Sequence, residues 1–529
     1  MERFSCLTFS VKNKCNLQRL SAGVFLIWGL LMLSGCATLQ KDFPRTESYA
    51  LEPSMRGTLA RVTNKIKTDL ESNESGFLML ANNDQALRWR LALADLAEHT
   101  IDIQYFIWHG DECGMLLMNR LLLAADRGVR VRILVDDILV QKGGHTIPAL
   151  NYHPNFEVRV FNPWDGRQGM GSGFEFIFNM KRLNHRMHNK LIVADNRMAI
   201  VGGRNIGNEY FGLDETFNFS DMDVLAAGPI ANKISRSFDI YWNSEWAYPG
   251  QGLVPEASSA ENLGKLRNYL TTFLNDEKSR KLLAEFPLDP HTWEEQLNDF
   301  IANKHSGTAG VVYDEPLVGK SIPPVQLTES LEDFAVGAEK EVLISSPYFI
   351  PDEGFLSGLK EFAEKGVHIK ILTNSLASTN HVIVHSAYKR YRRLVVEKGG
   401  ELYEARDDAA VKSIYDTPPV HSKHLGLHSK AIVVDRHLIY IGSLNLDPRS
   451  IYINTEFGLT IDSPDLGDEI AAVIGQYLAP ENSWRVKLDA KGRLNWVSNA
   501  GTIDKEPARN AWQRISVGFY GLLPIEDQL

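Results

Sequence analysis

The feature that most constrains this sequence is one polar pattern that occurs twice, about 240 residues apart. The copies are His188-x-Lys190-x4-Asp195-x6-Gly202-Gly203-x-Asn205 and His428-x-Lys430-x4-Asp435-x6-Gly442-Ser443-x-Asn445. In both copies the histidine and the asparagine are 17 positions apart. Identical spacing predicts an internal repeat of a whole domain, because solenoid units are only about 20–50 residues long.

The segments before each copy also repeat in the same order. In the first half the apolar spacing predicts helices over 87–97 and 115–126 and strands over 100–108 and 129–135. The corresponding segments in the second half are helices 325–337 and 355–364 and strands 341–350 and 367–373. We match Tyr105-Phe106 with Tyr348-Phe349, and Gly128-Val129 with Gly366-Val367. Alternating strands and helices predict an α/β fold with one mixed β-sheet layered by helices in each half.

The beginning of the chain differs from the rest. A basic start precedes the apolar run 20–33, which is shorter than the ~20 residues that span a bilayer and is typical of a secretory signal. Leu33-Ser34-Gly35-Cys36 resembles a bacterial lipoprotein cleavage site, which implies cleavage before Cys36 and a lipid on its thiol. Ala37 favours the outer over the inner membrane by resemblance to the sorting rule, with the folded part of the chain facing the periplasm. The alternative is an uncleaved anchor.

These patterns divide the chain into six parts. We expect a signal peptide over 1–35, a tether over 36–75, a first domain over 76–250, a connecting insertion over 251–310, a second domain over 311–500 and a tail over 501–529. The tail mixes Arg514 with Trp512 and Phe519, so it could lie on a membrane or pack on the enzyme's own body.

The spacing of the motif has a physical meaning. Segments 188–194 and 428–434 are predicted strands, so histidine and lysine at i and i+2 project from one face. Asp195 and Asp435 have the opposite parity and are predicted to be structural, starting turns at 196–197 and 436–437. The small residues let the backbone and the asparagine amide approach an anionic oxygen closely; they are Gly202, Gly203, Gly442 and Ser443.

The paired motif resembles the pattern that defines the phospholipase D superfamily. The segments RLNHRMHNK, VGGRNIGNEYFG, ILTNSLAS and NLDPRS are similar to the bacterial cardiolipin synthase branch, its C type in particular. The resemblance implies two tandem phospholipase D-like domains packed pseudo-symmetrically around one shared active site.

The resemblance also implies roles for the residues. One histidine, His188 by analogy, attacks phosphorus to form a phosphohistidine, and the other protonates the leaving alkoxide. Lys190, Lys430, Asn205 and Asn445 would hold the phosphoryl oxygens. Glu456, 28 positions after His428, would orient that histidine; for His188 we favour Asp223, 35 positions on, over Asp221. Neither a metal nor a cofactor is expected.

Three other side chains have open or ordinary roles. Arg204 and Arg449 would either contact phosphate or brace loops. His385 is expected to be a packed or solvent-facing histidine rather than part of the cleft.

The predicted function is a phosphatidyl transferase that forms cardiolipin from phosphatidylglycerol and a second phospholipid. A phospholipase D hydrolase would use the same residues and is the main alternative. A nuclease is less favoured, because the formal net charge is −10 and the start of the chain resembles an export signal, and no nucleic-acid partner is expected. A non-catalytic membrane-binding module is least favoured, since both motifs are intact. The expected partners are phospholipids, a membrane and an unidentified protein.

Overall fold

The computed structural model describes residues 39, 43–137, 145–164, 182–316, 326–523 and 526–528. The predicted signal peptide and Cys36 lie outside these residues. Residues 43–163 and 181–529 form one compact unit, to which the description below applies. Within the described ranges, no helix is both long and apolar enough to cross a bilayer.

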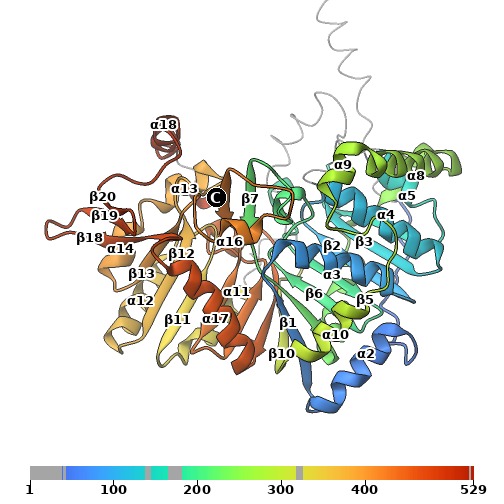
Figure 1. The fold of residues 1–529 in the computed structure, drawn as a ribbon, viewed down its shortest axis with the longest axis horizontal. Coiled ribbons are helices and arrows are strands. Elements are labelled where there is room, and N and C mark those ends of the chain that lie inside the picture. Colours follow the sequence, from blue (N-terminus) through green and yellow to red (C-terminus); the bar gives the residue numbers. More distant parts are fainter. Residues whose placement is uncertain are drawn as a thin grey trace, which may run out of the picture. The chain divides into compact units, whose positions relative to one another are not determined.

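The centre of the unit is one sheet of 18 strands (Figure 1). In spatial order the first repeat contributes β1 (Glu74–Leu80), β8 (Asp223–Ala227), β6 (Met198–Gly202), β5 (Lys190–Ala194), β2 (Thr100–Tyr105), β3 (Arg130–Asp136), β4 (Phe156–Phe161) and β9 (Ala247–Pro249). The second repeat contributes, in the equivalent order, β10 (His305–Tyr313), β17 (Phe457–Asp462), β16 (Leu438–Gly442), β15 (Ala431–Val434), β11 (Glu341–Ser345), β12 (His368–Asn374), β13 (Glu401–Ala405) and β18 (Ser483–Leu488). Two further strands, β19 (Leu494–Ser498) and β20 (Gly501–Ile503), follow β18 at this edge. β1 and β10 pair antiparallel and join the halves.

The sheet is mixed in each half, as predicted. β2, β3 and β4 are parallel, as are β11, β12 and β13, and the other pairs of the large sheet are antiparallel. The first parallel crossover of each half is a helix, α4 (Glu112–Asp126) or α12 (Glu353–Glu364). Gly128 and Gly366 follow these helices with φ of 97° and 79°, values that favour glycine. The match between these two glycines is therefore confirmed.

One hydrophobic core runs through both repeats. α7 (Pro229–Trp242) and the equivalent α17 (Pro464–Leu478) bury apolar faces in the same cluster as the central strands. Burial of this shared apolar surface stabilises the two repeats together. The other α-helices are α2 (Thr58–Ile66), α3 (Asn83–Leu96), α5 (Thr146–Leu150), α11 (Gln326–Val336), α13 (Val382–Tyr388), α14 (Arg392–Glu397), α15 (Lys412–Tyr415), α16 (Pro448–Tyr452) and α18 (Ala511–Tyr520).

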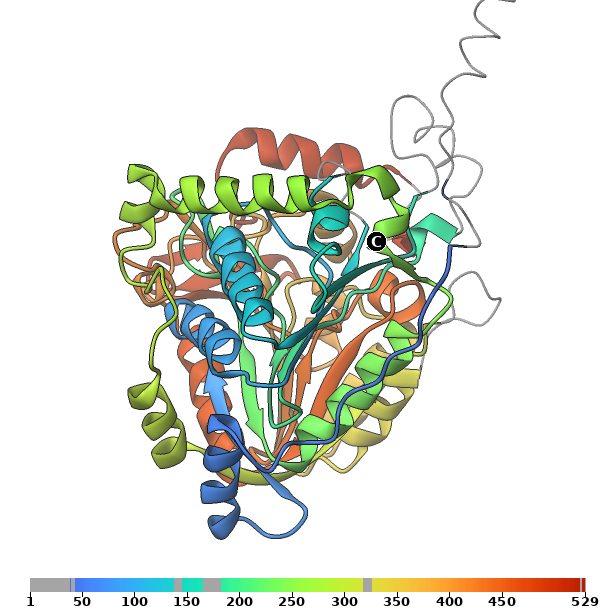
Figure 2. The ribbon, with the colours of Figure 1, turned by 90° about the vertical axis from the view of Figure 1, so that its right-hand side faces the viewer.

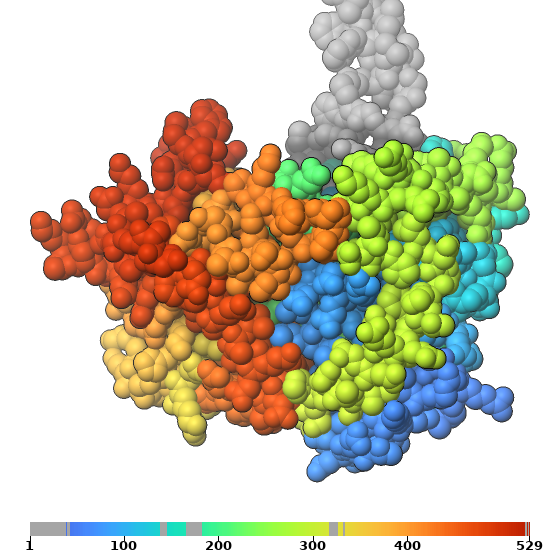
Figure 3. All heavy atoms as spheres, viewed as in Figure 1, coloured from blue at the N-terminus to red at the C-terminus, as the bar shows by residue number. Residues whose placement is uncertain are grey.

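The helices of the connecting insertion pack on the first repeat and on α2. The insertion contains α8 (Ala260–Asn275), α9 (Glu277–Leu282) and α10 (Glu294–Asn303), and α8 packs against α4 and α5 (Figure 2). Figure 3 shows this segment in yellow-green over the blue and cyan atoms of the first repeat. β10 begins at His305, so the predicted boundary between 310 and 311 falls inside a strand.

The predicted tether is bound to the first repeat from residue 43 onward. Arg132 donates to the Ser48 carbonyl at 2.8 Å, and Arg130 donates to the Tyr49 carbonyl at 2.8 Å. These hydrogen bonds from β3 hold the segment against the first repeat, because guanidinium groups donate and backbone carbonyls accept. Of the predicted tether 36–75, only residues 36–42 precede this bound segment.

The match of Tyr105-Phe106 with Tyr348-Phe349 is wrong by two residues. Tyr105 pairs with Lys190, whereas Ser345 pairs with Ala431, so Ser346-Pro347 is equivalent to Tyr105-Phe106. The two strands also end earlier than predicted, at Tyr105 and Ser345, after which the chain leaves the sheet.

Candidate active site

The backbone of each motif histidine is held by the other repeat. The strands begin at Lys190 and Ala431, later than predicted, so both histidines precede their strands. The His188 N–H donates to the Thr455 carbonyl at 2.9 Å, and the His428 N–H donates to the Ser220 carbonyl at 2.8 Å. Neither half-site is therefore complete within its own repeat.

The side chains cross between the repeats in the same way. His188 Nδ1 lies 2.9 Å from Glu456 Oε2, and His428 Nδ1 lies 2.5 Å from Asp221 Oδ2. The predicted pairs, Glu456 with His428 and Asp223 with His188, are wrong. The cause is the strand register, which pairs Gly202 with Asp223 and Gly442 with Gly458 and so makes Asp221 the equivalent of Glu456.

Asp223 binds buried arginines instead. Its Oδ2 lies 2.8 Å from Arg90 Nη2 and 3.1 Å from Arg204 Nη1. Arg204 is fully buried and also donates to the carbonyl of Asp221 at 2.7 Å. Of the two roles left open for Arg204, the structure therefore supports loop bracing.

The extra length before Asp221 forms a short strand. β7 (Phe217–Ser220) pairs in parallel with β14 (His424–Leu427), and Asp221 and His428 directly follow these strands. On the other side, the equivalent contact is a single bridge between Met187 and Thr455. The extra residues before Asp221 therefore place this carboxylate of the first repeat beside His428 of the second repeat.

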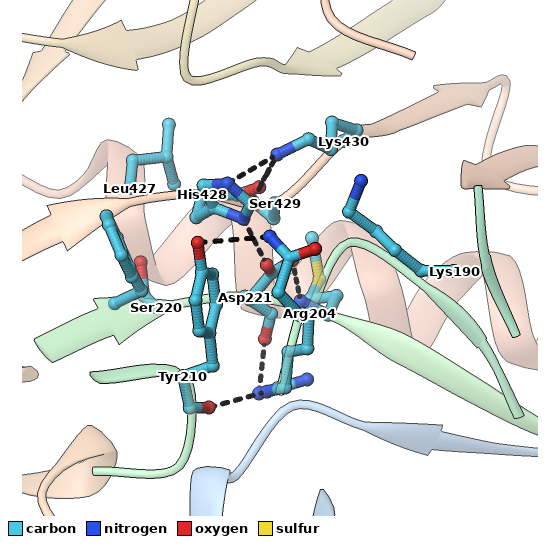
Figure 4. A network of polar contacts seen from close by, with 12 residues as sticks. Lys190, Arg204, Tyr210, Ser220, Asp221, Leu427, His428, Ser429 and Lys430 are labelled. Atoms are coloured by element: carbon cyan, nitrogen blue, oxygen red, sulfur yellow. Dashed lines mark hydrogen bonds and ion pairs between the residues drawn. The ribbon is translucent and has the colours of Figure 1, made fainter. Parts of the chain in front are cut away.

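The two lysines lie beside the histidines. Lys430 Nζ donates to the His428 carbonyl at 2.5 Å and lies 3.2 Å from His428 Nε2 (Figure 4). Lys190 Nζ likewise donates to the His188 carbonyl, and Figure 4 shows Lys190 close to the His428 cluster. Burial lowers the pKa of Lys430 to about 8 and brings the pKa of Lys190 well below its usual range.

The electrostatics place both histidines in one shared site. Burial lowers the pKa of His188 and of His428, and the ammonium groups of both Lys190 and Lys430 lower each pKa further. Both imidazoles are therefore neutral at rest near pH 7.

The two carboxyl groups differ in charge. Burial raises the pKa of Glu456 to about 8, in spite of nearby Lys190 and the Ser443 hydroxyl. Burial acts on Asp221 in the same direction, but His428, Lys430 and Arg204 outweigh it and lower the pKa of Asp221 to about 2. Asp221 is ionised at pH 7, whereas Glu456 is largely protonated.

The small motif residues accommodate these carboxyl groups. A Cβ at Gly203 would lie 2.3 Å from Asp221 Oδ1, so a side chain there would displace the carboxylate. At the equivalent place Ser443 donates its hydroxyl to Glu456. A Cβ at Gly202 would meet Asp223, and one at Gly442 would meet the Phe457 carbonyl. These positions therefore lie against oxygens of the protein itself, and the approach to a substrate oxygen stays a prediction.

The two asparagines differ in their bonding. Asn205 accepts from the Ile107 N–H at 3.2 Å and donates to the Tyr210 hydroxyl at 3.0 Å. Asn445 donates to Ser450 Oγ at 3.2 Å, and its buried oxygen has no hydrogen-bond partner within the described part of the chain. Each amide nitrogen keeps one N–H that can donate to a phosphoryl oxygen, whereas the free Oδ1 of Asn445 can only accept, for example from a substrate hydroxyl.

Asp195 and Asp435 are structural, as predicted, but their partners are distant. Asp195 accepts from the backbone N–H groups of residues 98–100, and Asp435 from those of residues 339–341. The turns are centred one residue earlier than predicted, since Asp195, Asn196, Asp435 and Arg436 have φ between 47° and 64°. Asparagine and aspartate tolerate this region better than most residues.

Sequence reasoning missed several contacts of the site. Phe106 lies edge-on to His188, with centroids 4.9 Å apart, while Tyr210 and Phe219 lie 5.1 and 4.9 Å from His428. Asp314 accepts from the Glu456 N–H at 2.9 Å. No local pattern marks these residues; the pairing of β7 with β14 brings Phe219 to the site, and the pairing of β10 with β17 brings Asp314.

Other predicted residues lie at the edge. Arg449 donates to Asn184 Oδ1 at 2.9 Å, and His385 is buried beside Arg392, as a packed histidine. Among the described residues, no group of three or more histidine, cysteine, aspartate or glutamate side chains could hold a metal ion.

Comparison with known proteins agrees with this geometry. A family described as "Cardiolipin synthase, PLD-like domain" matches residues 91–242 and 333–478. Cardiolipin synthase C of Escherichia coli K12 is 35% identical over 86% of this chain and 96% of its own length. Cardiolipin synthase A of Pseudomonas putida is 26% identical over 74% of this chain and 67% of its own length.

A solved structure shows the same fold. Phosphatidylserine synthase of Haemophilus influenzae superposes with a TM-score of 0.53 at 14% identity, covering 80% of this chain and 91% of the other. The crossed half-sites, the repeat and these matches lead to one conclusion: the chain belongs to the cardiolipin synthase family of PLD-like domain proteins and is an enzyme of phospholipase D type.

Proposed function

We propose that this enzyme transfers a phosphatidyl group between phospholipids and forms cardiolipin from phosphatidylglycerol and a second phospholipid. The observation that carries the proposal is the crossed pairing, in which the Nδ1 atoms of His188 and His428 are bound by Glu456 and Asp221 of the opposite repeats. This leaves Nε2 of both rings for chemistry, beside Lys190 and Lys430. The cardiolipin synthases among the relatives supply the substrate class.

In the first step His188 Nε2 attacks the phosphorus of the donor lipid. A nitrogen–phosphorus bond forms, the bond from phosphorus to the headgroup oxygen breaks, and His428 gives its Nε2 proton to that oxygen. The bound phosphodiester anion offsets the field of the lysines, so binding raises the pKa of His428 and supports its protonation.

In the second step His428 accepts a proton from the incoming hydroxyl. The oxygen of the acceptor lipid attacks phosphorus, and the bond to His188 breaks. Lys190, Lys430 and Asn445 stabilise the charge on the phosphoryl oxygens in both steps.

Phosphatidylglycerol labelled in its acyl chains, with and without phosphatidylethanolamine, tests the proposal with purified full-length protein, because both cardiolipin and phosphatidic acid would retain this label. We expect labelled cardiolipin, with a yield that depends on the lipid mixture. Phosphatidic acid without cardiolipin in every mixture would instead establish a phospholipase D hydrolase.

We also propose that the mature protein starts at Cys36 and is held by its lipid on the outer membrane, facing the periplasm. The support is the basic start, the short apolar run and the Leu-Ser-Gly-Cys exit. Cys36→Ser should abolish both acyl labelling and cleavage. A wild-type chain that keeps residues 1–35 and carries no acyl label would identify an uncleaved anchor.

The tail is proposed as a second membrane contact. Val517 faces the body of the enzyme, whereas Trp512, Phe519 and Leu522 are 72%, 62% and 82% exposed. An exposed apolar face on a helix suits the interfacial region of a bilayer. The double variant Trp512→Ser/Phe519→Ser should bind vesicles more weakly, while Tyr152→Ser, also at an exposed aromatic residue, should not.

A further inference from the structure

A cavity of about 340 Å³ lies beside the His188 half-site. Its volume is in the range of about 300–1,000 Å³ that is typical of ligand pockets. One wall is formed by the first repeat and the other by α8 of the connecting insertion; residues that line it include Phe106, Trp108, Met115, Met118, Leu266 and Tyr269.

The cavity borders the reacting histidine. Phe106 lines the cavity and also contacts His188, with ring centroids 4.9 Å apart. Asp136 lines it too and accepts from the Met187 N–H, one residue before His188, at 3.0 Å. A lipid with its phosphate at His188 therefore has an apolar space directly beside it.

The polar groups of the cavity are engaged elsewhere. Asp136 is bound to Arg186 at 3.2 Å, and His109 forms an ion pair with Glu209 at 3.4 Å. The remaining lining residues are mostly apolar. The cavity therefore suits hydrocarbon better than a second headgroup, which would need free hydrogen-bonding groups.

The second repeat has its own apolar cavity, of about 440 Å³ and lined by α11 and α12, but the two rings that contact His428, those of Tyr210 and Phe219, do not line it. Pro347 occupies the place equivalent to Phe106, and its carbonyl accepts from Asn374 at 3.2 Å. In addition, α8 belongs to the insertion, which packs on the first repeat.

We propose that this cavity binds one acyl chain of the phospholipid whose phosphate reacts at His188. The proposal rests on the proposed function for the lipid class. It assigns the connecting insertion a role, which is to complete a chain-binding site on the donor side.

The first test is photolabelling with phosphatidylglycerol that carries a diazirine in one acyl chain. We expect adducts on Met115, Met118 and Leu266 in the full-length protein. Adducts confined to exposed residues such as Trp512 and Phe519 would overturn the cavity assignment. Since labelling needs no turnover, a positive result would stand even if the enzyme formed no cardiolipin.

The second test fills the cavity. Met118→Trp and, from the other wall, Leu266→Trp should each lower kcat/KM roughly tenfold on dipalmitoyl lipid, because excluding two methylenes weakens binding about that much. The loss on dihexanoyl lipid should be much smaller. Leu394→Trp, at a 40% exposed position of α14, is the matched control and should leave the chain-length dependence unchanged.

Thermal unfolding must show that a variant is folded before its kinetics are interpreted. One folded variant of the two is enough for the test. Equal losses on short and long chains in a folded variant would contradict acyl-chain binding in this cavity.

Discussion

The two half-sites occupy equivalent places in the repeats, yet their partner groups are different. His428 faces Asp221, whose pKa is lowered, beside Gly203; His188 faces Glu456, whose pKa is raised to about 8, beside Ser443. An ionised partner stabilises an imidazolium, whereas a largely neutral one does not. The difference suits His428 to proton transfer and His188 to nucleophilic attack.

The surroundings differ in the same sense. Phe106 contacts His188 and lines the apolar cavity, while Tyr210 and Phe219 contact His428. A donor lipid bound through its acyl chain would present its phosphate to His188. Two half-sites at equivalent places of a symmetric fold are therefore suited to different chemical roles.

Replacement of either histidine should produce the largest effect. His188→Ala and His428→Ala should each lower turnover by about 10⁴-fold or more, because each supplies one part of a shared mechanism. The comparison is sharpened by trapping the phosphoenzyme in the His428→Ala variant with a good leaving group, where we expect the label on His188.

Label on His428 in the matching His188→Ala experiment would reverse the two roles. Substantial turnover in both single variants would rule out the two-histidine mechanism.

The sequence predicts the histidines and lysines but not their carboxylate partners. The motif spacing is local and marks His188, Lys190, His428 and Lys430 without ambiguity. Each carboxylate partner comes from the opposite repeat. Its identity therefore depends on strand register and on the extra residues that form β7. Counting 28 positions from one histidine and 35 from the other therefore assigned Glu456 to the wrong ring and selected Asp223 in place of Asp221.

The fold was more accessible to prediction than the site for the same reason. Alternating helices and strands and the repeat of a whole domain are local features, and they predict the mixed sheet. The joining of both halves through β1 and β10 is a long-range pairing that hydrophobic periodicity alone does not indicate. The acyl-chain cavity also depends on packing of α8 against α4.

The carboxylate variants should separate the half-sites. Asp221→Asn should lower kcat on the order of 10³-fold, as expected for loss of an ionised group that stabilises an imidazolium. Glu456→Gln should cost about 10- to 100-fold, since it mainly loses orientation of His188. Circular dichroism and thermal unfolding check that both proteins are folded. Equal losses of kcat in the two variants would show that both carboxyl groups contribute equally, contrary to this expectation.

The pH dependence gives a finer comparison, with changes of roughly tenfold on each side of the optimum. Glu456 must be ionised to accept the Nδ1–H of His188 and leave Nε2 with a free lone pair. In the substrate complex His428 is already protonated, so kcat should rise as pH increases towards about 8. Lys430, with a pKa of about 8, then loses its charge and phosphate binding falls. Asp221 contributes no limb near neutral pH because its pKa is lowered.

Variants assign these limbs. Glu456→Gln should remove the rising limb, and Lys430→Arg should move the falling limb above pH 9, since guanidinium stays charged. A profile that is flat between pH 6 and 9 would contradict both assignments.

The turn aspartates should show the smallest difference between the repeats, and in stability rather than turnover. Asp195 is 5% exposed and Asp435 is partly exposed, and each accepts backbone N–H groups from the loop before β2 or β11. Replacing a buried acceptor leaves donors unsatisfied, so Asp195→Asn should lower the free energy of unfolding by about 2 kcal/mol and Asp435→Asn by about 1 kcal/mol. Chemical denaturation measures both values, and kcat per folded molecule should remain near wild type.

Burial acts to raise the pKa of Asp435, but its three backbone N–H partners outweigh burial and lower it. Its contribution is therefore present above the unfolded pKa of about 4 and is lost as pH falls through the lower folded value. The difference between wild type and Asp435→Asn should accordingly shrink in acid, and a variant that stayed fully stable but lost turnover would place Asp435 in the chemistry instead.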